Sequence, residues 1–138
     1  MKYKKTRSDA YAPTMAYESD AGFDVYHCGD PVEIFPHTHK QIKLGIAIGI
    51  ENDEVAIISE RSGHAIRDGI TTIGNIIDAG YTGEISAIIR TGAQKMIVNA
   101  GDKIAQIIVM KLGAREIVEV DELSVTQRGE KAHHSSGQ

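Results

Sequence analysis

The sequence contains no tryptophan, only two phenylalanines and a single cysteine among its 138 residues. One cysteine cannot form a disulfide within the chain, so Cys28 is expected to behave as a small hydrophobic side chain. A chain without disulfides fits a reducing compartment, and we therefore expect a cytoplasmic protein. Isoleucine dominates the apolar residues, which favours a β-rich core of branched aliphatic side chains.

An excess of positive charge and long apolar runs are also missing. The formal net charge of −4 leaves no broad basic surface, so nucleic acid is not an expected partner. A polyanionic small ligand would have to be held by a few local cations and backbone amides. No apolar run approaches the length that spans a membrane, and residues 1–5 lack the apolar region of a signal peptide, so no membrane partner is expected.

The length and the pattern of short strands predict one all-β domain. Many short runs of β-branched residues are separated by turn signals, which is typical of a β-sandwich or barrel. The clearest strand is 41–50, where apolar residues alternate without a break, and 116–120 is expected as the last strand. A short helix is expected at 62–68. Residues 1–123 then form the domain, and the polar residues 124–138 form a flexible C-terminal arm.

The stretch from residue 74 to residue 83 combines a turn, a carboxylate and an aromatic ring. Gly74 and Asn75 lie between two predicted strands and are a signal for a two-residue hairpin, because both tolerate positive φ. Backbone groups at such a tip could pair with the polar edge of a flat heterocycle. Asp78 and Tyr81 follow within a few residues. On its own the stretch is more typical of a plain hairpin, since short motifs produce false positives.

A second group of residues has the chemistry that phosphate binding needs. Arg61, Ser62 and Gly63 follow a strand and offer a guanidinium, a hydroxyl and an approachable backbone amide. Gln106 stands in an apolar strand, where it is either a structural hydrogen-bonding group or a ligand contact. Asp24 is either an ordinary strand-end carboxylate or a group that orients a cation or a metal-bound water.

Five segments in order resemble the five motifs of the trimeric deoxyuridine triphosphatases (dUTPases), and the resemblance covers residues 10–137. It implies a jelly-roll-like, distorted β-barrel and a homotrimer with three sites at the subunit boundaries. Each site would hydrolyse dUTP to dUMP and pyrophosphate with Mg²⁺, and the last motif would arrive as a flexible arm. The segments are Ala21-Gly22-Phe23-Asp24, Arg61-Ser62-Gly63, Ile77 to Gly83, Gly101 to Gln106, and Arg128-Gly129 through Ser135-Ser136-Gly137.

The resemblance also implies roles for single residues. Asp78 would orient the attacking water as a general base, and Tyr81 would lie under the deoxyribose, leaving no room for a 2′-hydroxyl. Magnesium would sit on the three phosphates with mostly water as its other ligands, and Asp24 would support its water shell or the phosphate site. The backbone of Gly74, Asn75 and Ser86 would read uracil. The phosphates would be held by Arg61, Ser62, Gly63, Gln106, Arg128, Ser135 and Ser136, with His133 stacked on the base.

Several positions depart from that family's usual pattern. Glu60 stands where proline usually precedes the Arg-Ser-Gly motif, and it adds a negative charge near the phosphates. Asn75 stands where many members have glycine. In the arm, His133 takes the place of phenylalanine and Lys131-Ala132 replaces two glycines, which predicts a weaker lid. A viral source would place the protein in the host cytoplasm.

Three other functions compete with hydrolysis of dUTP. A dCTP deaminase would share the fold, but it needs a carboxylate on the strand after the third motif, where this chain has Ile88, and Glu84 comes too early. A catalytically weak or silent trimer could bind nucleotide or a protein; the intact Asp78 and Tyr81 argue against it and the altered arm argues for it. A β-sandwich interaction module would leave the five segments as coincidence.

Overall fold

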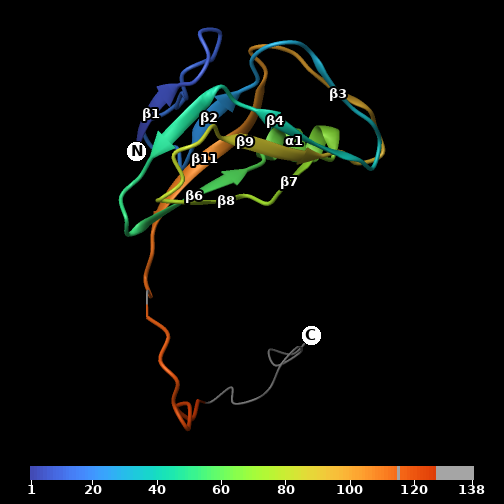
Figure 1. Ribbon diagram of the computed structural model, residues 1–138. Helices are drawn as coiled ribbons and strands as arrows, with labels where there is room; N and C mark the ends of the chain where they lie inside the picture. The colour runs from blue at the N-terminus through green and yellow to red at the C-terminus, as the bar shows by residue number, and fades with distance from the viewer. Residues whose placement is uncertain (115, 127–138) are drawn as a thin grey trace.

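Short antiparallel strands form the body of the molecule (Figure 1). The computed structural model describes residues 1–114 and 116–126. This part of the chain contains eleven strands and one helix, so the predicted all-β class is confirmed. The elements are β1 (Lys2–Lys5), β2 (Phe23–Tyr26), β3 (Val32–Ile34), β4 (His39–Lys43), β5 (Ile46–Gly49), β6 (Glu54–Ser59), α1 (Ser62–Asp68), β7 (Thr71–Ile73), β8 (Ile76–Asp78), β9 (Ser86–Arg90), β10 (Met96–Val98) and β11 (Lys103–Lys111).

Two larger sheets and two strand pairs organise the chain. One sheet has the order β2-β11-β6-β8 and the other the order β4-β9-β7, while β1 pairs with β5 and β3 with β10. All pairings are antiparallel. Because the described strands are divided among four separate sheets, their hydrogen-bond ladder does not close into a barrel.

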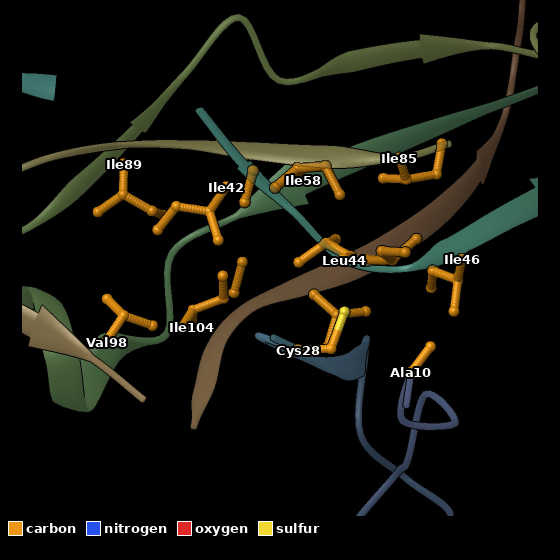
Figure 2. Packing of buried hydrophobic residues seen from close by; sticks show 14 of the residues in the cluster. Ala10, Cys28, Ile42, Leu44, Ile46, Ile58, Ile85, Ile89, Val98 and Ile104 are labelled. Atoms are coloured by element: carbon orange, nitrogen blue, oxygen red, sulfur yellow. The ribbon is translucent and has the colours of Figure 1, made fainter. Parts of the chain in front are cut away.

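Branched aliphatic side chains from both larger sheets meet in one core (Figure 2). Ile58 on β6 and Ile104 on β11 are buried together with Ile42 on β4 and Ile89 on β9. Cys28 is also buried in this cluster as a free thiol, as its predicted hydrophobic role requires. The isoleucine-rich composition therefore fills the space between the sheets without a large aromatic side chain at its centre.

The predicted single strand over 41–50 is wrong, because Gly45 divides it into β4 and β5. Gly45 has a φ of 68°, in the left-handed region that glycine adopts without steric cost. The two halves then join different partners: β4 pairs with β9 and β5 pairs with β1. The alternation of Ile42, Leu44, Ile46 and Ile48 still holds, since all four side chains are buried.

The predicted hairpin at Gly74 and Asn75 is also wrong. β7 pairs with β9 and β8 pairs with β6, so the two residues form a crossing between the two larger sheets. Gly74 has a φ of 60°, but Asn75 does not have a positive φ. The carbonyl of Asn75 instead accepts a hydrogen bond from the backbone N–H of Ile58 at 2.8 Å. Of the two residues, only Gly74 therefore has the predicted positive φ.

The helix prediction is confirmed with its bounds, while the last strand is not. Helix α1 ends at Asp68, and Gly69, with a φ of 62°, provides the left-handed C-cap. No strand forms over 116–120, and residues 116–126 run away from the body of the molecule (Figure 1). None of the described residues belongs to a helix long and apolar enough to cross a membrane.

Candidate functional site

The Arg-Ser-Gly segment lines a polar cavity of about 500 Å³. Strand β6 ends at Ser59 and α1 begins at Ser62, so Arg61 is the extended residue that leads into the helix, with φ −84° and ψ 131°. The N–H groups of Ser62 and Gly63 come before the first hydrogen bonds of α1, in which His64 and Ala65 donate to the carbonyl of Arg61, and such leading amides suit an anion. The lining also includes Gly22, Asp24 and Gln106, so residues from three of the predicted motif segments meet here.

Asp24 holds two cations at the wall of this cavity. Its carboxylate accepts from Nε of Arg61 at 2.8 Å and from Nζ of Lys103 at 2.8 Å, and its side chain is only 15% exposed. The hydrogen bond with Asp24 raises the pKa of Lys103, so this amine keeps its proton over the ordinary pH range. A guanidinium has five N–H donors, so pairing through Nε leaves Arg61 able to bind an anion as well.

Gln106 has the structural role that the sequence left open, and it also lines the cavity. Its Nε2 donates to the backbone carbonyl of Glu60 at 3.1 Å, and it lies opposite Asp24 on β2 and Ser59 on β6. Gly22 allows this close approach, because an ideal Cβ at that position would lie 3.1 Å from Oε1 of Gln106. The side chain is thus fixed against the start of the Arg-Ser-Gly segment.

A second cavity of about 250 Å³ brings together Gly74, Asp78, Tyr81 and Ser86. The hydroxyl of Tyr81 donates to the backbone carbonyl of Glu84 at 3.0 Å, while half of the side chain stays exposed at 50%. Asp78 is the last residue of β8 and is exposed. The cavity therefore combines a free carboxylate, an aromatic face and backbone groups. Among the predicted uracil-reading residues, Asn75 is not part of this lining.

The two cavities share no lining residue, and Asp78 and Arg61 lie near opposite ends of β6. Asp78 is paired with Val55 near the start of that strand, whereas Arg61 follows its end, six residues later. At about 3.3 Å per residue, roughly 20 Å separate the two positions along the strand. Within one chain the described residues therefore line two separate cavities, one with Arg61 and one with the carboxylate of Asp78 and the ring of Tyr81.

Comparison with known families decides what kind of protein has this arrangement. A family model described as dUTPase matches residues 8–137. The chain belongs to the dUTPase family. The deoxyuridine 5′-triphosphate nucleotidohydrolase of Tropheryma whipplei strain Twist is 40% identical over 131 residues, covering 92% of this chain and 89% of that protein. The protein of the same name from Clostridium tetani is 38% identical over 140 residues, covering 99% and 96%.

Solved dUTPase structures share the fold. A dUTPase of Staphylococcus bacteriophage 80α bound to dUpNHpp superposes with a TM-score of 0.91 at 24% identity, covering 99% of this chain and 98% of that one. A dUTPase from phage φ11 of S. aureus, described with a structural Mg(II) ion, gives a TM-score of 0.83 at 22% identity, covering 90% and 98%. At these identities the likeness establishes the jelly-roll-like fold of the dUTPases for this chain.

The described residues offer no direct ligand set for a divalent metal. No group of three or more His, Cys, Asp or Glu side chains in residues 1–114 and 116–126 could hold such an ion. The carboxylate of Asp24 is occupied by Arg61 and Lys103. An ion carried by the phosphates of a nucleotide, with water as its other ligands, is compatible with this arrangement of the described residues.

Sequence reasoning missed two residues near the two cavities. Lys103 lies inside the fourth motif segment, but its contact with Asp24 depends on the pairing of β2 with β11 and has no local signal. Glu84 fixes Tyr81 through its carbonyl, and its side chain accepts from the N–H of Gly45 at 3.1 Å. The four predicted arm residues lie outside the described part of the chain: Arg128, His133, Ser135 and Ser136.

Proposed function

We propose that this chain hydrolyses dUTP to dUMP and pyrophosphate. Its relatives of about 40% identity bear the name of that activity, and the chain keeps the chemistry the reaction needs. The observation that carries the proposal is the 250 Å³ cavity in which Asp78, Tyr81 and the backbone of Gly74 and Ser86 converge. A cytoplasmic location is part of the same proposal and is supported by the free thiol of Cys28.

The proposed reaction is attack of a water molecule on the α-phosphorus. Asp78 holds the water and accepts one of its protons, a new P–O bond forms, and the bond from the α-phosphorus to the bridging oxygen breaks. Pyrophosphate leaves with the electron pair of that bond. The exposure of Asp78 and its place at the end of β8 support this role, because a nucleotide and a water can both reach the carboxylate.

The base and sugar are proposed to bind in the same cavity. Uracil presents an acceptor, a donor and an acceptor, and the backbone of Gly74 and Ser86 would pair with that edge, whereas cytosine would leave groups unpaired. The carbonyl of Asn75 accepts a hydrogen bond from the N–H of Ile58, and a part for its backbone in reading uracil stays a prediction. The ring of Tyr81, held by its hydroxyl, would pack under the deoxyribose and exclude a 2′-hydroxyl.

The triphosphate is proposed to enter with its magnesium ion and bind the cationic cavity. Arg61, Ser62, Gly63 and Gln106 would contact the phosphates, and the ion would neutralise part of their charge. For Asp24 we infer the phosphate-site role, because it orients Arg61 and Lys103. Outside the described residues, the arm groups Arg128, Ser135 and Ser136 would add phosphate contacts and His133 would stack on the base.

A homotrimer would complete the site from two half-sites. Roughly 20 Å of strand β6 separates Asp78 from Arg61 within one chain, which is too far for one nucleotide's α-phosphate region to use both closely. A closed cyclic assembly would bring the cationic cavity of one copy to the Asp78 cavity of the next. Three boundaries would then give three equivalent sites.

Two alternatives are less well supported. In a dCTP deaminase the needed carboxylate would replace Ile88, and the nearby Glu84 is already occupied by Gly45 and by Nζ of Lys43 at 3.3 Å. A catalytically weak or silent trimer that binds nucleotide or a protein would keep the cationic cavity but would have no use for an exposed Asp78 beside Tyr81. The departures from the family pattern in the arm favour this silent trimer.

One assay separates these functions. Pyrophosphate release from dUTP, measured with and without magnesium, should be fast only with the metal, and UTP and dCTP should be poor substrates. Ammonia release from dCTP would instead identify a deaminase. Binding of a non-hydrolysable dUTP analogue without any pyrophosphate release would identify the silent trimer and would overturn the proposed function.

A further inference from the structure

Glu60 directly precedes the proposed phosphate-binding segment 61–63, at a position where the resemblance implies proline. A carboxylate there would be expected to repel a triphosphate. Its carboxylate is turned to the second sheet, however: Oε2 accepts from the backbone N–H of Thr72 at 3.2 Å and from the Thr72 hydroxyl at 2.7 Å. Thr72 lies on β7 and is only 9% exposed, so both donors are in a largely dry environment.

The main chain of Glu60 is held from the opposite side. Its carbonyl accepts from Nε2 of Gln106 on β11 at 3.1 Å. The end of β6 is tied to β7 as well, since the Thr72 hydroxyl also lies 3.3 Å from the carbonyl of Ile58. Glu60 is therefore fixed between the two larger sheets, by its side chain to one and by its carbonyl to the other, one residue before Arg61.

We propose that Glu60 is a positioning residue that sets the geometry of the phosphate-binding segment 61–63 by tying it to Thr72 on the opposite sheet. This inference rests on the proposed function, in which Arg61 contacts the triphosphate. Proline would restrict the backbone at position 60 through its ring. Glu60 restricts the same position through a hydrogen-bonded carboxylate, so the departure from the family replaces one constraint with another.

The charge of Glu60 is consistent with that assignment. The hydrogen bond from the Thr72 hydroxyl is the main cause that lowers the pKa of Glu60, so the carboxylate is ionised at neutral pH. A charged acceptor binds its two donors more strongly than a neutral one would. The same charge still repels phosphates electrostatically, so positioning and repulsion predict opposite effects when the side chain is removed.

The decisive experiment measures binding of inorganic tripolyphosphate with magnesium to the full-length protein by calorimetry. Glu60→Ala removes both the tie and the charge, and we expect affinity to fall about tenfold, the scale of one lost hydrogen bond to a charged group. Glu60→Gln is the matched control, because its amide oxygen can accept from both Thr72 donors without the charge. We expect it to stay within about threefold of the unaltered protein. Equal affinity in Glu60→Ala would show that Glu60 does not position the segment, and higher affinity would show that it only repels phosphate; either result would overturn the inference.

Variants of the partner residue keep the test valid if Glu60→Ala does not fold. Thr72→Val removes the hydroxyl donor and should weaken tripolyphosphate binding, whereas Thr72→Ser keeps the donor and should not. In the double variant Glu60→Ala/Thr72→Val the two losses should not add, because both remove the same contact. A lower unfolding temperature with unchanged affinity in these variants would mean that the tie is only structural, and would also overturn the inference.

Steady-state kinetics separate this inference from the proposed function. For Glu60→Ala we expect KM for dUTP to rise about tenfold while kcat changes much less, because phosphate binding and not the water-attack step is disturbed. If the unaltered protein releases no pyrophosphate from dUTP, the proposed function fails, and the tripolyphosphate comparison still tests the role of Glu60. If it turns over dUTP and Glu60→Ala keeps the same KM, only the inference on Glu60 fails.

Discussion

Among single residues, Asp78 is the one on which the proposed chemistry depends most directly. We predict that Asp78→Asn keeps assembly and binding of a dUTP analogue, because the amide fills the same space at an exposed strand end. The variant lacks the group that accepts the proton of the water, so kcat should fall by roughly 10²–10⁴. Rates of pyrophosphate release, beside calorimetry of the analogue, would measure the two effects separately. Turnover near that of the unaltered protein would remove Asp78 from the reaction.

Discrimination between deoxyribose and ribose should depend on the ring of Tyr81. We predict that Tyr81→Ala relaxes the preference for dUTP over UTP, since the ring that excludes the 2′-hydroxyl is lost. The ratio of kcat/KM for the two nucleotides would measure it. An unchanged ratio would mean that the ring only packs.

Gly83 allows a subtler version of that experiment. An ideal Cβ at Gly83 would lie 2.5 Å from Oη and 2.7 Å from Cζ of Tyr81, so Gly83→Ala must displace the ring without deleting it. We expect the variant to lose part of the preference for dUTP. Gly80→Ala is the matched control, because no atom lies within 4 Å of a Cβ there. The same loss of preference in both variants would point to the loop as a whole and not to the ring.

At the level of the elements, the break between β4 and β5 depends on one glycine. Gly45 has a φ of 68°, and an ideal Cβ there would lie 2.7 Å from both Cβ of Ala10 and Sγ of Cys28. We predict that Gly45→Ala lowers the free energy of unfolding by about 2–4 kcal/mol, through backbone strain and overpacking together. Gly49→Ala, on the exposed end of β5 with no atom within 4 Å of its Cβ, should change it little. Urea unfolding of both variants would check this, and equal losses would contradict it.

The arm is the element whose role rests on the sequence motif. We predict that deletion from Arg128 onward leaves the assembly intact but lowers turnover of dUTP sharply, because the phosphates lose the arm's cation and hydroxyls. Ordering the arm costs roughly 1–2 kcal/mol of conformational entropy per residue fixed, and contacts with the nucleotide must offset this cost. His133→Phe would stack a larger ring on the base and should therefore tighten closure of the full-length arm. A truncated protein as fast as the full chain would show that the arm is not a lid.

Elements were predicted well where the signal is local and poorly where it depends on the partner strand. The bounds of α1 follow from residues 62–68 and the glycine that caps them, and they were predicted correctly. The crossing at Gly74 resembles a hairpin in sequence. A left-handed glycine between two strands is compatible both with a hairpin and with a connection from one sheet to the other. Which strand β7 joins is decided by the packing of Thr72 and Ile73 against β9, and no local pattern contains that information.

The sequence shows the chemistry of the candidate site residues but not their arrangement. Arg61 and Asp78 each line a cavity, and their roles stay predictions. Their separation along β6 is not visible, since it depends on which end of the strand β8 pairs with. The contact of Asp24 with Lys103 was missed for the same reason: the two residues are far apart in the chain and meet only where β2 pairs with β11.

For the whole molecule, the separation of the half-sites leads to a prediction about assembly. We expect a homotrimer in solution, because a closed ring of three gives every Asp78 cavity a cationic cavity from a neighbour. Light scattering coupled to size exclusion would measure the mass directly, at about three times the 15.0 kDa of one chain. A fully active, monodisperse monomer would refute both the assembly and the shared site.

Because Arg61 and Asp78 lie near opposite ends of β6, two variants that are each inactive should give an active assembly when their chains are mixed. Chains carrying Arg61→Ala and chains carrying Asp78→Asn each lack a different half of every site. When the two are unfolded together and reassembled at random in equal amounts, about one site in four receives an intact Asp78 from one chain and an intact Arg61 from its neighbour. Activity in the mixture would then depend on which two chains meet at a boundary, and not on either chain by itself.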